Sequence, residues 1–191
     1  MQHDENDPFF LWKRNVIDEF KSLSEEEIAK QLKLRSNNFA VLMTNVIGDF
    51  NIGTVIRSAN FHGANEFYYY GRKRFDRRSC VGVHNYTPVN FLSTIEEVGS
   101  LAEKYTFIAL ENNVKDTISM YDFDWRTPKP PLIIVGEESV GIQDEVIKMC
   151  NHKIEIPNYG SVRSINVGSA ASIAMHDYVY KKNRNNRKVS Y

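Results

Sequence analysis

The sequence has few cysteines and lacks any long apolar run. Only two cysteines occur among its 191 residues, Cys80 and Cys150, and they do not form a Cys-x-x-Cys pair. This argues against a disulfide framework and against a zinc site, so we expect two reduced thiols. No segment approaches the ~18 consecutive apolar residues that favour a membrane-spanning helix. The acidic start, MQHDENDPFFLWK, also lacks the pattern of a signal peptide. We therefore expect a cytoplasmic protein that does not enter a membrane.

Several common functional motifs are missing as well. There is no G-x-G-x-x-G after the first predicted strand and no G-x-x-x-x-G-K-[ST], which argues against dehydrogenases and P-loop NTPases. No G-x-S-x-G elbow is present, which disfavours an α/β-hydrolase. The five histidines show no metal-ligand spacing, so we predict no metal site. Because 24 basic residues balance 24 acidic ones, a polyanion would have to bind a local basic patch.

What the sequence does contain is an alternation of apolar strands and amphipathic helices. Strands are predicted at 39–43, 66–70, 106–110, 132–135 and 153–156, and helices at 51–60, 94–104, 142–150 and 165–182. This alternation predicts an α/β domain with a mainly parallel sheet and helices on both faces. We assign residues 38–182 to this domain, residues 1–37 to a short helical N-terminal extension and residues 183–191 to a basic polar tail. Within the extension, Ser24 to Glu27 fits a helix capping box.

The helix after the first strand carries a glycine and an arginine on one side. Its apolar residues recur at helical spacing and form one buried stripe: Ile52, Val55, Ile56 and Ala59. Arg57 points roughly opposite this stripe, and Gly53 lies one turn before it on the same side. A glycine in a helix interior costs about 1 kcal/mol relative to alanine. We therefore expect another group to approach the helix closely at Gly53.

Two further polar segments follow predicted strands. Residues 136–141, read GEESVG, come directly after a buried strand. Residues 156–167 are rich in turn formers and lead into a helix that begins with small residues. Ligands tend to bind at the carboxyl ends of parallel strands, which favours a binding site here. Solvated acids in a turn, and tight packing of a helix on a sheet, are the structural alternatives.

Three segments together, in this order and spacing, resemble the motifs of the SpoU (TrmH-type) family of RNA ribose 2′-O-methyltransferases, in the SPOUT superfamily. Asn51-x-Gly53-x-x-x-Arg57-x-Ala59 resembles the first motif, and Gly136-Glu137-Glu138 within 132–142 resembles the second. The third is matched by Ile156-Pro157 followed by Ser164-Ile165-Asn166-Val167. The resemblance covers residues 38 to 182.

The resemblance implies a C-terminal deep trefoil knot, against the general rule that chains do not knot. It also implies a homodimer whose subunits complete each other's active sites. Loops of the knot would bind S-adenosylmethionine through the following residues: Leu110, Gly136, Ile156, Ser164, Ile165 and Asn166. The implied reaction is methyl transfer to a ribose 2′-hydroxyl of tRNA or rRNA, without a metal. Gly53 would then leave room for the ribose and for the partner subunit.

The resemblance also implies catalytic roles. A guanidinium over the reacting hydroxyl stabilises a developing alkoxide, and we favour this role for Arg57 because arginine keeps its proton in proteins. The proton acceptor stays open. Asn51 and Glu138 would orient Arg57, while Ser164 with Asn166 would position a phosphate or the cofactor. Glu137 replaces the asparagine of the usual Gly-Asn-Glu-Gly motif, as Ser139 replaces its second glycine, but Glu138 is retained.

Two other functions compete with this interpretation. A catalytically silent RNA-binding homologue would keep the knot as a scaffold, but it would have no chemical need for all the catalytic residue types retained here. A small-molecule or nucleotide α/β enzyme is disfavoured by the missing phosphate motifs.

A dense basic loop after the second strand is the predicted RNA contact. Its charged residues are Arg72, Lys73, Arg74, Arg77 and Arg78. Phe75 lies among them and is expected to stack on a base. The alternative is a solvated loop, but the position at a strand's carboxyl end, on the side of Arg57, favours RNA contact. Since the net charge is zero, we expect RNA affinity to be modest and strongly salt-dependent.

Overall fold

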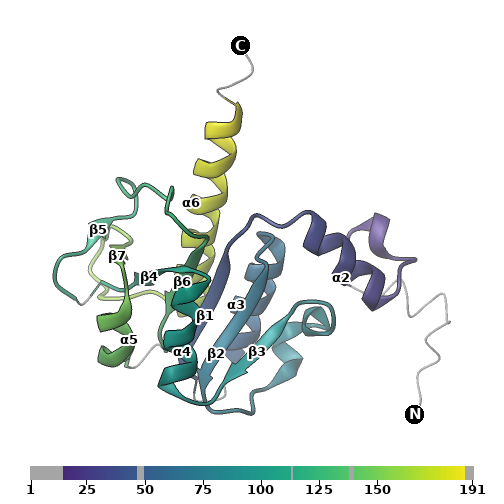
Figure 1. Cartoon of the computed structure of the whole chain (residues 1–191), viewed down its shortest axis with the longest axis horizontal. Helices are drawn as coiled ribbons and strands as arrows, with labels where there is room; N and C mark the ends of the chain where they lie inside the picture. The colour runs from purple at the N-terminus through teal and green to yellow at the C-terminus, as the bar shows by residue number, and fades with distance from the viewer. Residues whose placement is uncertain (1–14, 47–49, 113, 138–139, 188–191) are drawn as a thin grey trace.

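A computed structural model of the chain describes residues 15–46, 50–112, 114–137 and 140–187. Its strands are β1 (Ala40–Val46), β2 (Glu66–Gly71), β3 (Val89–Leu92), β4 (Thr106–Leu110), β5 (Ile118–Ser119), β6 (Pro131–Val135) and β7 (His152–Glu155). They form one seven-stranded sheet in the order β3-β2-β1-β6-β4-β7-β5, and all the pairings are parallel (Figure 1). The predicted mainly parallel sheet is confirmed.

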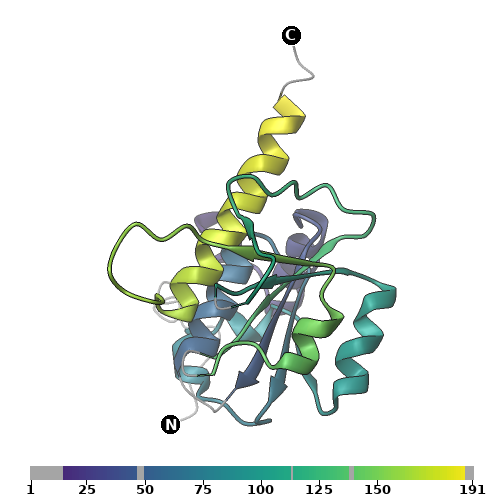
Figure 2. The same ribbon diagram turned by 90° about the vertical axis from the view of Figure 1, so that its left-hand side faces the viewer.

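Helices cover both faces of this sheet. The helices are α2 (Glu25–Leu34), α3 (Phe50–Phe61), α4 (Ile95–Ser100), α5 (Asp144–Met149) and α6 (Val167–Arg187), with 3-10 turns η1 (Asp18–Phe20), η2 (Arg77–Cys80), η3 (Val83–Asn85) and η4 (Leu101–Glu103). Figure 2 shows the sheet between α3 with α6 on one side and α4 with α5 on the other. Alternate residues of β1 enter two cores: Val41 and Met43 pack on the α3–α6 side, whereas Leu42 packs on the α4–α5 side.

Helix α2 of the N-terminal extension begins at the predicted capping box. The Ser24 hydroxyl accepts a hydrogen bond from the Glu27 amide at 3.2 Å, and the Glu27 carboxylate accepts one from the Ser24 amide at 2.8 Å. This confirms the start of α2. Before Ser24, the described part of the extension that was expected to be helical contains only η1. Among the described helices, none combines the length and the apolar character that crossing a bilayer requires.

The apolar stripe of α3 is buried as predicted, and Arg57 on the other side is exposed. The close approach expected at Gly53 is confirmed, but the group that approaches is Ser79 rather than the expected ribose and partner subunit. A Cβ added at Gly53 would lie 1.9 Å from the Ser79 hydroxyl oxygen and 2.7 Å from the Ser79 carbonyl carbon. The space beside Gly53 is therefore filled by η2 of the same chain, which leaves no room there for a ribose or a partner subunit.

The small residues at the start of α6 allow it to pack closely on α3. A Cβ added at Gly168 would lie 2.8 Å from the Thr54 methyl carbon. One turn later, the hydroxyls of Ser58 and Ser172 lie 2.7 Å apart. Tight packing was thus the right alternative for these small residues, but they pack on helix α3 rather than on the sheet as expected.

The contact between Gly53 and Ser79 can be tested by a single methyl group. Gly53→Ala should gain about 1 kcal/mol of helix propensity but lose about 1–3 kcal/mol to overpacking, because backbone atoms of η2 cannot move away by a rotamer change. We expect a net loss in the free energy of unfolding, measured by urea denaturation.

Gly99→Ala is the matched control. Its added Cβ would meet only the Met149 side chain, at 3.8 Å, so this variant should be as stable as the parent or more stable. A Gly53→Ala protein more stable than the parent would contradict the packing described.

Candidate functional site

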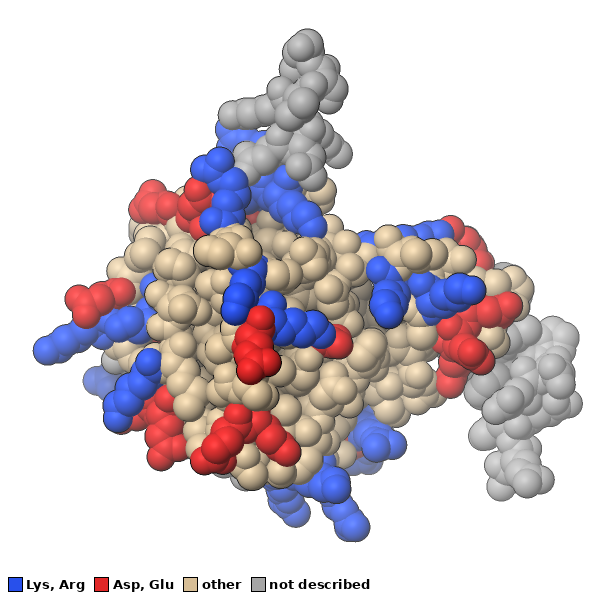
Figure 3. Space-filling model, in the orientation of Figure 1, with Lys and Arg blue, Asp and Glu red and all other residues tan. Residues whose placement is uncertain are grey.

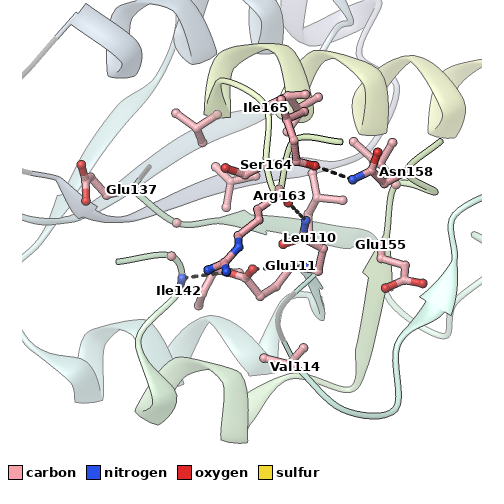
Figure 4. A pocket seen from close by; sticks show the side chains of 18 of the residues that line it. Leu110, Glu111, Val114, Glu137, Ile142, Glu155, Asn158, Arg163, Ser164 and Ile165 are labelled. Atoms are coloured by element: carbon pink, nitrogen blue, oxygen red, sulfur yellow. Dashed lines mark hydrogen bonds between the residues drawn. The ribbon is translucent and has the colours of Figure 1, made fainter. Parts of the chain in front are cut away.

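A cavity of about 380 Å³ lies at the carboxyl ends of β4, β6 and β7 (Figure 4). Pockets for small ligands measure roughly 300–1,000 Å³. The loops that follow these three strands line it, and they contribute five of the six predicted cofactor residues: Leu110, Gly136, Ile156, Ser164 and Ile165. Residues from three separate segments of the chain therefore meet at the edge of the sheet where a ligand was expected.

The loop after β6 is folded tightly by its two glycines. Gly141 has φ of 73°, and its amide donates to the Glu137 carbonyl at 2.7 Å. A Cβ on Gly136 would lie 2.0 Å from the Gly141 carbonyl carbon, so the two ends of the loop touch. Glu137 lines the cavity. Glu138 lies outside the described residues, and its predicted orienting role stays a prediction.

The loop between β7 and α6 is held by side chains that bind backbone groups, as its turn formers predict. Asn158 accepts from the Gly160 amide at 2.8 Å and donates to the Val162 carbonyl at 2.5 Å. Tyr159 lies between Asn158 and Gly160 in the sequence. It lines the cavity, and 87% of its surface is exposed. Arg163 extends across the cavity toward Glu111 in Figure 4.

Asn166 caps α6 and links it to α3. Its side-chain oxygen accepts from the amides of Gly168 at 2.9 Å and Ser169 at 3.3 Å. Its side-chain nitrogen donates to the Asn51 side-chain oxygen at 2.9 Å. Asn166 does not line the cavity, although it was predicted to contact the cofactor. The structure thus joins the first and third motifs through these two asparagines.

Arg57 lies apart from the cavity of its own chain. Its exposed side chain lines a second groove, of about 790 Å³, together with Ile17 and Phe61. Asn51 precedes it by six residues, or about 9 Å along the helix axis. Within one chain, Arg57 is therefore not brought to the cavity, and the catalytic roles assigned to these side chains stay predictions.

Arg57 does lie near the basic loop. Burial raises the pKa of the Cys80 thiol to about 11, while the charges of Arg77 and Arg57 act in the opposite direction. The packing of Gly53 on Ser79 explains this proximity, because η2 carries Arg77 and Cys80.

The basic loop itself is only partly as predicted. Its five charged residues are all exposed: Arg72, Lys73, Arg74, Arg77 and Arg78. Arg78 is paired with Asp76, whose carboxylate oxygens accept from its Nε at 2.9 and 3.0 Å. The hydrogen bonds from Arg78 hold the pKa of Asp76 below its usual value. The Phe75 ring packs edge-on against Tyr69, with ring centroids 5.3 Å apart, and its expected stacking on a base stays a prediction.

The sequence interpretation overlooked two cavity residues at the end of β4. Glu111 and Asn112 both line the cavity, and both hydrogen-bond to neighbouring loops. Their position directly after a predicted buried strand was the signal that could have identified them. In the described part of the chain, no group of three or more His, Cys, Asp or Glu side chains is placed to hold a metal ion.

Comparison with known proteins gives one family. Residues 38–176 match the model of the SpoU rRNA Methylase family, which is well over half of the 191-residue chain. A tRNA (guanosine(18)-2′-O)-methyltransferase of Aquifex aeolicus is 23% identical over 157 residues, which cover 80% of this chain and 74% of that protein. The enzyme of the same name from Escherichia coli K12 is 24% identical over 154 residues, 78% of this chain and 66% of that protein.

Solved structures show the same fold. The crystal structure of the A. aeolicus TrmH/SpoU tRNA modifying enzyme superposes with a TM-score of 0.73 at 20% identity, covering 85% of this chain and 84% of that one. The SpoU methyltransferase AviRb from Streptomyces viridochromogenes, in complex with AdoMet, superposes with a TM-score of 0.66 at 23% identity. That likeness covers 80% of this chain and 61% of AviRb.

The two roles of Asn166 can be separated by substitution. Asn166→Ala should lower the free energy of unfolding by about 1 kcal/mol, because it removes the N-cap of α6. Asn166→Asp keeps an oxygen for the cap but loses the donor to Asn51, so it should retain most of the stability. Denaturation of both variants measures the difference.

Asn51→Ala provides the control, because it removes the acceptor of the hydrogen bond that the Asn166 side chain donates. Because Asn51→Ala and Asn166→Asp both break this bond, the double variant should lose less stability than the sum of the two single losses. If Asn166→Asp is as unstable as Asn166→Ala, the capping role is contradicted.

Proposed function

The chain belongs to the SpoU rRNA Methylase family, and we propose that it transfers a methyl group from S-adenosylmethionine to a ribose 2′-hydroxyl of tRNA or rRNA. The observation that carries the proposal is the cavity at the carboxyl edge of the sheet, where five residues expected to contact the cofactor lie together. The names of the relatives, which are tRNA 2′-O-methyltransferases, and the AdoMet complex of AviRb support it.

The cavity suits S-adenosylmethionine chemically. Apolar side chains such as Leu110, Ile142 and Ile165 offer a surface for an adenine ring. The carboxylates of Glu137 and Glu155 also line the cavity, and they complement a cofactor that carries a sulfonium and an ammonium group. S-adenosylmethionine would supply an activated methyl group here.

The chain's own residues would act on the acceptor. We propose that Arg57 lies over the ribose 2′-oxygen and stabilises the negative charge that develops as its proton leaves. Ser164 and Asn166 would position a phosphate or the cofactor, with Asn51 and Glu138 orienting Arg57. Fixing the acceptor against the cavity would supply much of the remaining rate enhancement.

A homodimer would bring Arg57 to a cavity. Arg57 lines a groove away from the cavity of its own chain. A second copy of the chain would complete the site by placing its own arginine at this cavity. The same α3–α6 side exposes apolar side chains: Phe61 is 85%, Tyr180 55% and Ile173 39% exposed. The rings of His62 and His176 connect Phe61 to Tyr180, and an exposed patch of this kind favours burial against a partner.

We also propose that the C-terminal segment forms the trefoil knot implied by the family resemblance. The long connection between β4 and β6 passes beside α6 (Figure 2), where Lys181 donates to the carbonyls of Met120 at 2.6 Å and Tyr121 at 3.1 Å. Trp125 of this connection donates to Asp177 of α6 at 2.7 Å. A chain that extends to its full contour length when pulled from both ends would contradict the knot.

The expected path for RNA runs along the carboxyl edge of the sheet. The basic loop follows β2, and β1 alone separates β2 from β6, where the cavity begins. Elsewhere, basic and acidic side chains are interspersed over the face shown in Figure 3. A contact with cytoplasmic tRNA or rRNA would thus depend on this local patch.

Arg57→Ala should abolish most methyl transfer while leaving S-adenosylmethionine binding intact. Removing one group that stabilises a developing oxyanion costs roughly 10²–10³ in rate. Single-turnover transfer of labelled methyl to total tRNA and rRNA measures the rate, and calorimetry measures cofactor affinity. Arg126→Ala, an exposed arginine outside the cavity and the groove, is the control. Wild-type turnover in Arg57→Ala would contradict its role, and cofactor binding with no transfer to any RNA would select the silent homologue.

Complementation shows whether the site is shared between subunits. Arg57→Ala should be co-expressed with Ile165→Trp, which fills the cavity. A heterodimer of the two retains one arginine and one cavity on opposite chains, so a shared site regains activity. If both groups act within one chain, the mixture stays inactive, and the composite site is wrong.

The basic loop should set the salt dependence of RNA binding. Changing Arg72, Lys73 and Arg74 together to alanine should weaken binding and reduce the slope of log K against log salt by about two to three, since each phosphate contact contributes ~0.7–0.9. Filter binding at several salt concentrations measures the slope. The control changes Arg126, Lys129 and Lys148, and an equal effect in the control would exclude a specific role for the loop.

A further inference from the structure

The end of β4 lies between the two loops that form the cavity. In the sheet, β4 is hydrogen-bonded to β6 on one side and to β7 on the other. Its carboxyl end therefore emerges between the β6–α5 loop and the β7–α6 loop. The two residues that follow β4 are Glu111 and Asn112, and each reaches toward one of these loops.

Glu111 binds the β6–α5 loop. One carboxylate oxygen accepts a hydrogen bond from the Ile142 amide at 3.2 Å, and the other accepts from the Asn112 amide at 3.0 Å (Figure 4). The contact also depends on Gly141, because a Cβ there would lie 2.5 Å from the first of these oxygens. The φ of 73° at Gly141 turns the chain so that the next amide points at the carboxylate.

Asn112 binds the other loop. Its side-chain nitrogen donates to the Arg163 carbonyl at 2.6 Å, directly before Ser164. Since the Glu111 carboxylate also accepts from the Asn112 amide, the two residues form one connected unit. This unit links backbone groups at Ile142 and Arg163, on opposite sides of the cavity.

We propose that Glu111 is a positioning residue for the cofactor, which holds the β6–α5 loop and, through Asn112, sets its spacing from the β7–α6 loop. The inference rests on the proposed function for the identity of the ligand. A carboxylate that accepts two backbone N–H groups makes charge-assisted hydrogen bonds, which are stronger than those of neutral acceptors. Loops held in the bound geometry lose less freedom on binding, so the ligand is bound more tightly.

The proposal separates Glu111 from the other acids that line the cavity. Asp144 also lines it and is exposed, at the first position of α5. Removing the charge of Asp144 weakens only the general attraction for a cationic ligand, whereas the loss of Glu111 also releases the loop. Asp144→Asn is therefore the control for charge alone.

The test measures S-adenosylmethionine affinity by calorimetry and backbone amide exchange at Ile142 without ligand. Glu111→Ala should weaken binding at least tenfold and speed exchange at Ile142, while Asp144→Asn should change affinity less than threefold and leave this exchange unaltered. Glu111→Gln keeps one acceptor oxygen and should fall between them. The midpoint of thermal unfolding shows that each variant is folded.

The outcomes distinguish this inference from the proposed function. If the parent protein binds no S-adenosylmethionine, the proposed cofactor is wrong, yet faster exchange at Ile142 in Glu111→Ala would still establish the contact between carboxylate and loop. If the parent protein binds the cofactor and Glu111→Ala binds it equally well, the positioning role is overturned. Equal weakening by Glu111→Ala and Asp144→Asn would also overturn it, because charge alone would then explain both.

Discussion

The close packing of α3 against α6 is the contact on which the arrangement of the site depends. Gly168 has no side chain to hold Thr54 away, and Ser58 and Ser172 meet through their hydroxyls. At the end of this contact, the side chains of Asn51 and Asn166 are hydrogen-bonded although 115 residues separate them. Because α3 carries Arg57 and the start of α6 lines the cavity, this packing fixes the arginine relative to the loops that line the cavity. It does so while directing the arginine away from the cavity of its own chain.

Much of the fold could be predicted from the sequence because its central strands are buried on both faces. β4 and β6 contain only buried residues, so each is a continuous apolar run that a pattern detects. β3 and β5 escaped prediction because they are short and partly exposed at the edges of the sheet. The packing partner of Gly53 could not be predicted either. A helical pattern shows that close approach is possible, but Ser79 reaches the helix from a 3-10 turn with no periodic signal.

The residues of the candidate site could likewise be predicted only in part. The family resemblance located Gly136 and Ile165, whereas composition and spacing indicated only that loops at strand ends matter. Glu111 was missed although it follows the predicted strand at 106–110, because a single carboxylate after a strand carries no motif. Its proposed role depends on the hydrogen bond that it accepts from the Ile142 amide, and the register of β4 beside β6 determines that pairing. Side-chain contacts between distant loops depend on such registers, which no local pattern encodes.

Acidic and basic side chains gather at different places along the carboxyl edge of the sheet, although the net charge of the chain is zero. Glu111, Glu137 and Glu155 line the cavity and outweigh the charge of Arg163 there, whereas the exposed basic loop follows β2. The strand order places β2 two positions from β6, or about 10 Å at ~4.8 Å per strand. This spacing is comparable to the screening length of about 8 Å at physiological salt, so each charge cluster acts mainly on its own ligand. Under the proposed function, the acids favour a cationic cofactor and repel phosphate, while the basic loop attracts the RNA backbone. The phosphates are then held beside the cavity, and an uncharged ribose is the part of the RNA that can approach the acid-lined opening.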